Sequence, residues 1–368
     1  MDIRQKRWRG QGCLVLRGVY LLSALWWGGV MAGEPKAPAQ FSHTICKFFK
    51  ESEFAGIDKA ANGPAIAWEK TGVQPFNELI VSWNALRPAS GAMTVWLSVH
   101  HAGQWSRWHR LAEWSVHSQR TFVNKLNKYV HTKHCRLEMQ HGTEADGFKV
   151  KISFNDASDA NKLKAVFACV SRLDNFCLIR PHTSDLPSVA VRGVPRQSQM
   201  VLDHPRCYDL CSPTSTSMIV AYLCQKVMGN VVDCMHDYVL NFAEKVHDRG
   251  IDIYGNWILN VAQAFETCGG AAFFRVERLN SFYDLHRYLM QKLPVAVSVR
   301  RLPGGATPYA NGHIMVVVGW NRQKSCVICQ DPAFGSNGAV LKAYPLLRFL
   351  RAWGRSCNLA YVPMMRPS

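Results

Sequence analysis

Between residues 76 and 171, short segments in which apolar and polar residues alternate follow one another, separated by turn-forming residues. The clearest is FKVKISF, which places Phe148, Val150, Ile152 and Phe154 on one face and lysines and a serine on the other. About six or seven such strands in roughly 110 residues predict an antiparallel β-sandwich. We place this domain at residues 71–178, after an N-terminal extension at residues 33–70.

The pattern changes in the second half of the chain. Residues 179–190 hold prolines and polar residues without a helical period, which marks a linker. The segments SPTSTSMIVAYLCQKVM, NWILNVAQAFETCGG and SFYDLHRYLMQKL then read as helices. PVAVSVRRL begins a run of strands, in which HIMVVVGW and SCVICQDP are joined by NRQK and so are expected to be antiparallel neighbours. Residues 191–368 are therefore predicted to form an α+β domain.

Residues 1–32 have the layout of a secretory signal. A basic segment precedes the apolar run VYLLSALWWGGVMA, and small residues at its end predict cleavage after Ala32. The run falls short of the roughly 20 apolar residues that cross a bilayer. An uncleaved anchor is the alternative, and only in that form do we expect a membrane contact. The protein is thus expected to be exported, whether periplasmic, at the cell surface or secreted.

Charge and cysteine content narrow the classes of ligand. The net charge is +17, and removing residues 1–32, with five Lys/Arg and one Asp, leaves +13. The basic residues are not clustered with aromatic ones, so no nucleic-acid partner is predicted. Of the 13 cysteines, Cys326 and Cys329 form a Cys-x-x-Cys on an alternating strand, where their side chains face opposite sides. We therefore expect no metal site.

Five tryptophans lie in the predicted sandwich, and they permit two interpretations. Exposed aromatic rings could form a platform for carbohydrate, whereas Trp83 and Trp96, on apolar strands, are expected to be core residues. Trp105 and Trp108, next to a glycine-containing turn, are the pair expected to be exposed. A carbohydrate contact by this domain thus stays a hypothesis.

The segment CYDLCSPTSTSM places Cys211 directly before Ser-Pro, at the expected start of a helix. The positive end of a helix favours a thiolate, which makes Cys211 the candidate nucleophile. His313, where a strand leaves the Asn-Gly turn, is the candidate base, and Asp331 at the end of the next strand is its candidate partner. Gln199 is the candidate oxyanion donor. Cys207 competes with Cys211 for the role of nucleophile, and Gln197 competes with Gln199 for the role of oxyanion donor.

The segments VPRQSQ, CSPTSTSM, GNWILNVAQA, LPVAVSV, NGHIMVVVGW and CQDPAFG together resemble the cysteine peptidase family thirty-nine-like group, from about residue 191 to 361. The resemblance implies a papain-like fold and hydrolysis of a peptide or amide bond by a thiol, without metal or cofactor. It also implies a role for Asn256 and Trp257 in lining the substrate groove. The partner expected from it is a peptide or protein substrate. A cell-wall peptide is one candidate, and the resemblance does not select among the candidates.

Three functions remain open at this point. The first is an exported cysteine peptidase or amidase that works through Cys211, His313 and Asp331. The second is a binding or adhesion protein with a papain-like domain that has lost its activity. The third is a transglutaminase-like enzyme that transfers the acyl group to an amine. Hydrolysis and transfer share the acyl-enzyme, so these residues cannot separate the two.

Overall fold

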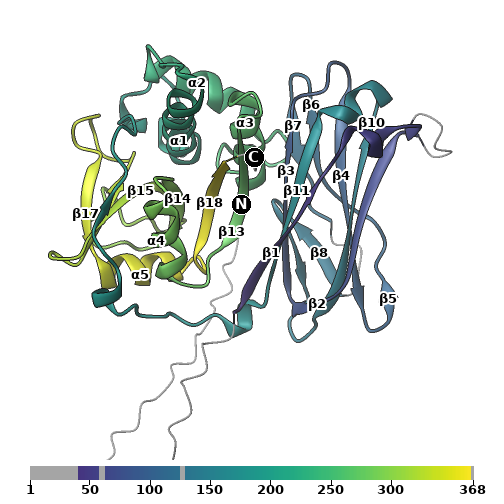
Figure 1. The fold of residues 1–368 in the computed structure, drawn as a ribbon, viewed down its shortest axis with the longest axis horizontal. Helices are drawn as coiled ribbons and strands as arrows, with labels where there is room; N and C mark the ends of the chain where they lie inside the picture. The colour runs from purple at the N-terminus through teal and green to yellow at the C-terminus, as the bar shows by residue number, and fades with distance from the viewer. Residues whose placement is uncertain (1–39, 58–62, 125–128, 366–368) are drawn as a thin grey trace, which may run out of the picture. The chain divides into compact units, whose positions relative to one another are not determined.

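Three antiparallel sheets organise the structure, a computed structural model that describes residues 40–57, 63–124 and 129–365 (Figure 1). The predicted signal and its cleavage point at Ala32 lie outside these residues. Each helix within the described ranges is too short or too polar to cross a lipid bilayer.

The N-terminal domain consists of two sheets. The first has the strand order β1-β11-β3-β9-β8, and the second has the order β2-β10-β4-β6-β7, with β5 on β4. The strands are β1 (Ser42–Phe48), β2 (Ala65–Phe76), β3 (Glu78–Ala85), β4 (Ala92–His101), β5 (Gln104–Trp105), β6 (His109–Ser115), β7 (Gln119–Thr121), β8 (Val130–Lys133), β9 (Arg136–Met139), β10 (Ala145–Phe154) and β11 (Leu163–Ser171).

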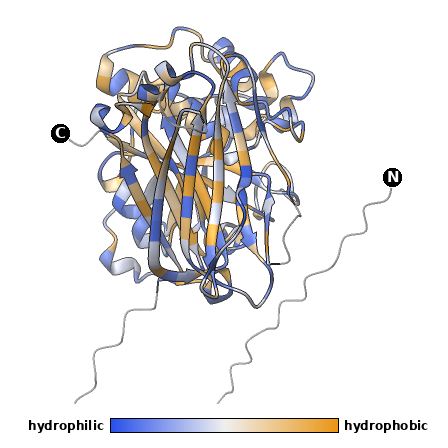
Figure 2. Cartoon of the chain, turned by 90° about the vertical axis from the view of Figure 1, so that its right-hand side faces the viewer, coloured by the Kyte–Doolittle hydropathy of each residue, from blue (hydrophilic) through white to orange (hydrophobic). Residues whose placement is uncertain are grey.

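The alternation read from the sequence sets the core between these two sheets. All four apolar residues of FKVKISF are buried on one face of β10, as predicted. Trp83 of the first sheet and Trp114 of the second are both fully buried, with ring centroids 6.0 Å apart, so the inner faces pack against each other. Figure 2 shows apolar and polar residues alternating along the strands of the sheet that faces the viewer.

The prediction that Trp96 belongs to the core is wrong. Met93, Val95 and Leu97 of β4 point inward, so Trp96 lies on the opposite, outer face of its sheet. There its indole Nε1 donates to Ser153 Oγ (3.1 Å), and cationic side chains lie over its ring. Trp108 is exposed (38%), as expected.

Both ends of the N-terminal domain differ from the boundaries expected from the sequence. The predicted extension at residues 33–70 includes β1, which pairs with β11, and the first half of β2, which pairs with β10. The predicted linker at residues 179–190 ends in β12 (Val189–Ala190), which pairs with β15. Trp320 also donates its indole N–H to the carbonyl of Leu186 (3.0 Å), so this segment packs on the C-terminal domain.

The C-terminal domain combines five helices with the third sheet. Figure 1 shows α1, α2 and α3 grouped together, apart from α4 and α5. The sheet order is β13-β18-β14-β15-β16-β17, and β15 and β16 are antiparallel neighbours, as predicted. The elements are α1 (Cys211–Met228), α2 (Met235–Val246), α3 (Trp257–Thr267), β13 (Ala272–Arg278), α4 (Phe282–Met290), β14 (Val295–Val299), β15 (His313–Asn321), β16 (Cys326–Gln330), β17 (Leu341–Pro345), α5 (Leu346–Gly354) and β18 (Leu359–Met365).

The N-terminal domain covers the outer edge of this third sheet. Strand β13 is the edge strand, and side chains of β3 bind the backbone groups that an edge leaves unpaired. Asn84 both accepts from the N–H of Phe274 and donates to its carbonyl, each at 2.8 Å. Glu78 forms a buried ion pair with Arg278.

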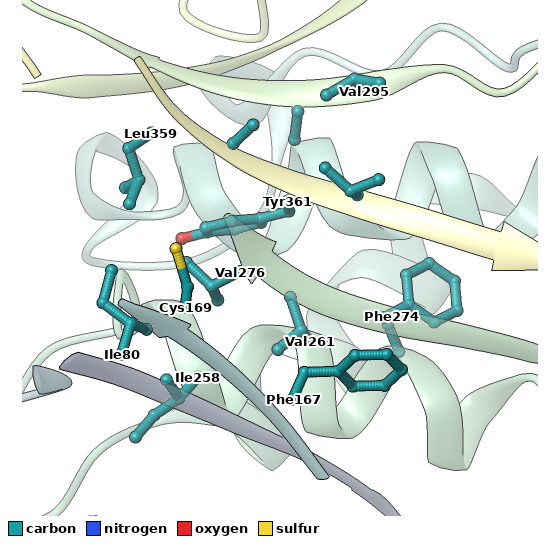
Figure 3. Close-up of a cluster of buried hydrophobic side chains, with 14 of the residues drawn as sticks. Ile80, Phe167, Cys169, Ile258, Val261, Phe274, Val276, Val295, Leu359 and Tyr361 are labelled. Carbon is teal, nitrogen blue, oxygen red and sulfur yellow. The ribbon is translucent and has the colours of Figure 1, made fainter. Parts of the chain in front are cut away.

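A continuous apolar core joins the two domains. Figure 3 shows Ile80, Phe167 and Cys169 of the N-terminal sheets beside Ile258 and Val261 of α3. Residues of β13, β14 and β18 complete this cluster, with Tyr361 near its centre. Burial of shared apolar surface therefore stabilises both domains together.

Candidate active site

Cys211 is the first residue of α1, as the sequence predicted. The N–H groups of the first helical turn have no partner within the helix, and they carry a partial positive charge. The backbone N–H groups of Ser212 and Ile314 make hydrogen bonds to the Cys211 sulfur. The Cys211 thiol is partly buried, with several N–H dipoles directed at it.

The polar residues that open α1 fix the helix on the sheet. Ser212 Oγ lies 3.0 Å from the hydroxyl of Tyr361 on β18, and Ser215 Oγ donates to the carbonyl of Ile314 on β15 (3.0 Å). Both serines are fully buried. The Ser- and Thr-rich start of the helix thus holds Cys211 next to the first residues of β15.

His313 begins β15 directly after Gly312, whose φ of +105° is in a region that favours glycine. Its Nε2 lies 2.8 Å from Asp331 Oδ1. The imidazole also makes a hydrogen bond with Cys211, for which Nδ1 is the remaining ring nitrogen. These contacts hold the imidazole between the thiol and the carboxylate, and His313 is only 5% exposed.

Asp331 follows β16 and is fully buried. Its Oδ2 accepts hydrogen bonds from two tyrosines, Tyr309 (2.8 Å) and Tyr344 (2.7 Å). Its Oδ1 accepts from His313 and from the backbone N–H of Ala333 (3.2 Å). Four donors therefore satisfy a carboxylate that burial alone would make costly.

Tyr309 also packs on the base. Its ring is stacked on the His313 imidazole, with centroids 4.1 Å apart and planes 13° from parallel. The backbone at Tyr309 has φ of +50°, and its carbonyl accepts from the N–H groups of Arg301 and Gly312. The loop before β15 thus holds the tyrosine against the imidazole.

The electrostatics favour a thiolate–imidazolium pair. Burial opposes the charged form of each group, but hydrogen bonds and charge outweigh it. The hydrogen bond with His313, and its charge, lower the pKa of Cys211 below the ordinary value. Hydrogen bonds with Asp331 and Cys211 raise the pKa of His313 to about 9. Contacts with His313 and the two tyrosines lower the pKa of Asp331.

Gln199 lies beside this group, but both of its amide hydrogens are engaged. Its backbone N–H donates to the carbonyl of Pro332 (2.9 Å), next to Asp331. Its Nε2 donates to the carbonyls of Cys207 (2.9 Å) and Tyr208 (2.8 Å). Gln197, the competing residue, is also buried and donates to the carbonyl of Ser198. In this structure the Gln199 amide holds the turn before the nucleophile.

Asn256 and Trp257 lie at the interface between the domains, where the sequence resemblance had implied a substrate groove. Asn256 caps α3 and donates from Nδ2 to Asp248 (2.7 Å) and to Thr121 of the N-terminal domain (3.2 Å). Guanidinium groups lie over the Trp257 ring, from Arg136 on β9 and Arg278 on β13. The contacts of Asn256 and Trp257 therefore join the two domains, as structural residues do.

The two tyrosines were missed by the sequence analysis. Tyr344 lies on β17, opposite Val327 at the start of β16. Val327, Cys329 and Asp331 alternate along one face of the sheet, so the Tyr344 side chain extends along that face until its hydroxyl reaches Asp331. The one signal for Tyr344 in the sequence is a tyrosine in the strand that follows Asp-Pro. Without the β16–β17 pairing, this signal does not indicate a contact with Asp331. Among the described residues, no cluster of three or more His, Cys, Asp or Glu side chains is suited to a metal ion.

Two family models match parts of the chain. Residues 191–361 match the model of the Peptidase_C39 like family, which confirms the resemblance seen in the sequence. Residues 65–161 match the model of the Peptidase C39 N-terminal domain. A search of curated proteins found no match. The chain therefore carries a domain of the peptidase C39-like family, preceded by a peptidase C39 N-terminal domain.

Proposed function

We propose that the chain is an exported cysteine peptidase or amidase that hydrolyses a peptide or amide bond through Cys211, His313 and Asp331. The observation that carries the proposal is the position of His313. It makes hydrogen bonds with the thiol of Cys211, which begins α1, and with the fully buried carboxylate of Asp331. Family membership supports a peptide or protein substrate.

The first half of the reaction forms an acyl-enzyme. The Cys211 thiolate adds to the carbonyl carbon, a C–S bond forms, and the carbonyl π electrons move to oxygen. When this tetrahedral intermediate collapses, the C–N bond breaks and His313 gives its proton to the leaving amine. Asp331 stabilises the imidazolium while it carries that proton.

The oxyanion needs hydrogen-bond donors. The backbone N–H of Cys211 opens α1 and lacks a partner within the helix, which makes it the first proposed donor. Gln199 stays the proposed second donor. Its position beside Pro332 supports this role, and it can donate to the oxyanion after releasing the carbonyl of Cys207 or Tyr208.

Water completes the reaction. The neutral His313 takes a proton from a water molecule that attacks the thioester carbonyl, and the C–S bond breaks to return the thiolate. A papain-like fold is proposed for the C-terminal domain. It is supported by a nucleophile in the first turn of α1, packed against an antiparallel sheet whose strand β15 begins with the base.

The test is the pH dependence of iodoacetamide labelling, read by mass spectrometry at Cys211 in the wild type and in His313→Ala. Cys207, four residues upstream and also partly buried, serves as the internal reference in the same molecule. Labelling of Cys211 well below the ordinary thiol pKa of about 8.5, lost in His313→Ala, would support the pair. Equal and slow labelling of both cysteines in both proteins would refute it.

Export is proposed from the sequence alone, because residues 1–39 lie outside the described part. Protein recovered from outside the cytoplasm should begin at Gly33 in N-terminal sequencing. Recovery of the intact Met1 terminus in the cytoplasm would contradict the proposal.

A further inference from the structure

Contacts on several sides fix the side chain of Tyr309. Its hydroxyl donates to Asp331 Oδ2 (2.8 Å) and accepts from the backbone N–H of Ala306 (2.9 Å). The loop backbone also packs closely on its ring, because a Cβ atom at Gly305 would lie only 2.4 Å from Tyr309 Cε2. The glycine at this position therefore makes room for the tyrosine ring, which is buried.

The backbone of the loop is strained where it carries this ring. Tyr309 and Arg301 each have φ of +50°, a left-handed conformation that residues other than glycine seldom adopt. The Arg301 N–H donates to the Tyr309 carbonyl (3.3 Å), so the two strained residues close the loop between them. Within residues 303–311, Tyr309 is the one buried residue. Strain of this kind is concentrated at functional sites, so it points to a function for the position of the ring.

The stacked tyrosine limits how the His313 imidazole can turn. Before the reaction, two hydrogen bonds hold the imidazole, one at Nε2 with Asp331 and one with the Cys211 thiol. Once Cys211 has become a thioester, its sulfur has neither a proton nor a charge, so the bond with Asp331 is left alone. One hydrogen bond at Nε2 restrains the tilt of the ring only weakly. Tyr309 blocks a turn about the Cβ–Cγ bond, because centroids 4.1 Å apart and planes 13° from parallel leave no room for the imidazole edge.

We propose that Tyr309 is a positioning residue for the second half of the reaction. Its stacked ring keeps the His313 imidazole in one plane while the acyl group is on Cys211, so that Nδ1 stays directed at the thioester. This role rests on the hydrolysis proposed above. It goes beyond that proposal because it gives the loop before β15 control of one step, deacylation.

Deacylation needs the imidazole in one tautomer and one orientation. The Asp331 carboxylate accepts from Nε2, so in the neutral ring Nε2 carries the proton and Nδ1 is the acceptor. A water molecule gives one proton to Nδ1 while its oxygen forms a C–O bond with the thioester carbonyl carbon. The C–S bond then breaks and its electron pair returns to sulfur. The products are a carboxylic acid and the Cys211 thiolate beside a protonated His313. A ring turned away from the thioester cannot accept this proton.

The experiment follows the loss of an acetyl group from Cys211. The full chain is treated with p-nitrophenyl acetate, the reagent is removed by gel filtration, and acetylated Cys211 is followed in time by mass spectrometry. Tyr309→Phe keeps the stacked ring and loses the hydroxyl, whereas Tyr309→Leu loses both. We expect deacylation in Tyr309→Leu to be at least about tenfold slower than in Tyr309→Phe, a part of the roughly 10²–10⁴-fold that a general base contributes.

Tyr344→Phe is the matched control, because it removes the other hydroxyl from the same Asp331 oxygen and leaves the stack intact. Its deacylation rate should be within about threefold of that of Tyr309→Phe. The pH profile gives a second readout. In Tyr309→Leu the rate should rise in proportion to hydroxide, as in His313→Ala, whereas in Tyr309→Phe it should level off once the imidazole is neutral.

Equal deacylation rates in Tyr309→Leu and Tyr309→Phe would overturn the role of Tyr309. Should Tyr309→Leu fail to fold, Gly305→Ala decides instead, because its Cβ atom cannot be accommodated with the ring in place. Slower deacylation is then expected, and an unchanged rate would overturn the proposal. If wild-type Cys211 is acetylated no faster than Cys207, the proposed hydrolysis itself fails, and the role of Tyr309 fails with it.

Discussion

Asn84 is the side chain with which the N-terminal domain binds the edge of the third sheet, and Asn84→Ala is the change that tests this contact. The amide forms two hydrogen bonds of 2.8 Å, one with the N–H and one with the carbonyl of Phe274. Asn84 is fully buried and Phe274 nearly so. Alanine would leave both backbone groups of Phe274 without a partner.

The magnitude follows from burial. Each buried polar group that loses its partner costs about 1–3 kcal/mol, so we expect Asn84→Ala to lower the free energy of unfolding by roughly 2–6 kcal/mol. That is a large share of the about 5–15 kcal/mol that stabilises an ordinary domain. A similar contact exists in which a side chain of the C-terminal domain binds the backbone of the N-terminal domain. Asn280 accepts from the N–H of Ser42 (3.1 Å) and donates to its carbonyl (3.0 Å), but this pair is only partly buried.

Water can replace the lost partners at Asn280, so Asn280→Ala should cost only about 1–2 kcal/mol. The assay is urea unfolding of both variants and the wild type, followed by tryptophan fluorescence and circular dichroism. If Asn84→Ala costs no more than Asn280→Ala, burial of the edge contact does not decide stability, and the reasoning fails.

Three further predictions concern the site and the cysteines. Tyr344→Phe removes one hydrogen-bond donor to Asp331, so the pKa of that carboxyl should rise. The low-pH limb of the pH profile for iodoacetamide labelling of Cys211 should then move to higher pH. An unchanged limb would show that Tyr344 does not stabilise the Asp331 carboxylate. The raised pKa of His313, about 9, means that its contribution to stability is complete below its ordinary value of about 6.5 and is lost as pH rises through about 9. The urea midpoints of wild type and His313→Gln should therefore converge across that range, and a constant difference would refute the linkage. The sulfurs of Cys224 and Cys268 lie 3.4 Å apart, so diamide should join them in a disulfide that non-reducing peptide mapping detects in the wild type but not in Cys224→Ser.

The parts of the fold that local periodicity controls could be read from the sequence. The two-residue period of β10 identified its buried face, and the helical stripe after Ser-Pro placed Cys211 in the first turn of α1. His313 and Asp331 were brought together by one hairpin, β15–β16, whose short connection is visible in the chain. In each case the relevant contacts lie within one element or between sequence neighbours.

Contacts that depend on distant segments could not be predicted in this way. Trp96 was taken as core because its strand is apolar overall, although strict alternation with Met93 and Val95 places it outside. Tyr309 and Tyr344 reach Asp331 through a loop and a third strand, whose register no spacing reveals. The partners of the Gln199 amide are carbonyls of an irregular turn, for which the sequence has no periodic signal.

The interface between the domains and the candidate site share one strand. Tyr361 of β18 lies within the apolar cluster that joins the domains (Figure 3). Its hydroxyl is 3.0 Å from Ser212 Oγ, in the residue after Cys211. Strand β18 pairs with β13, whose outer edge is bound by Asn84. The N-terminal domain therefore supports the strand that fixes the start of α1, because an unsupported edge strand at β13 would expose apolar surface and unpaired backbone. The position of the Cys211 thiol thus depends on both domains, although every residue of the proposed triad comes from the second.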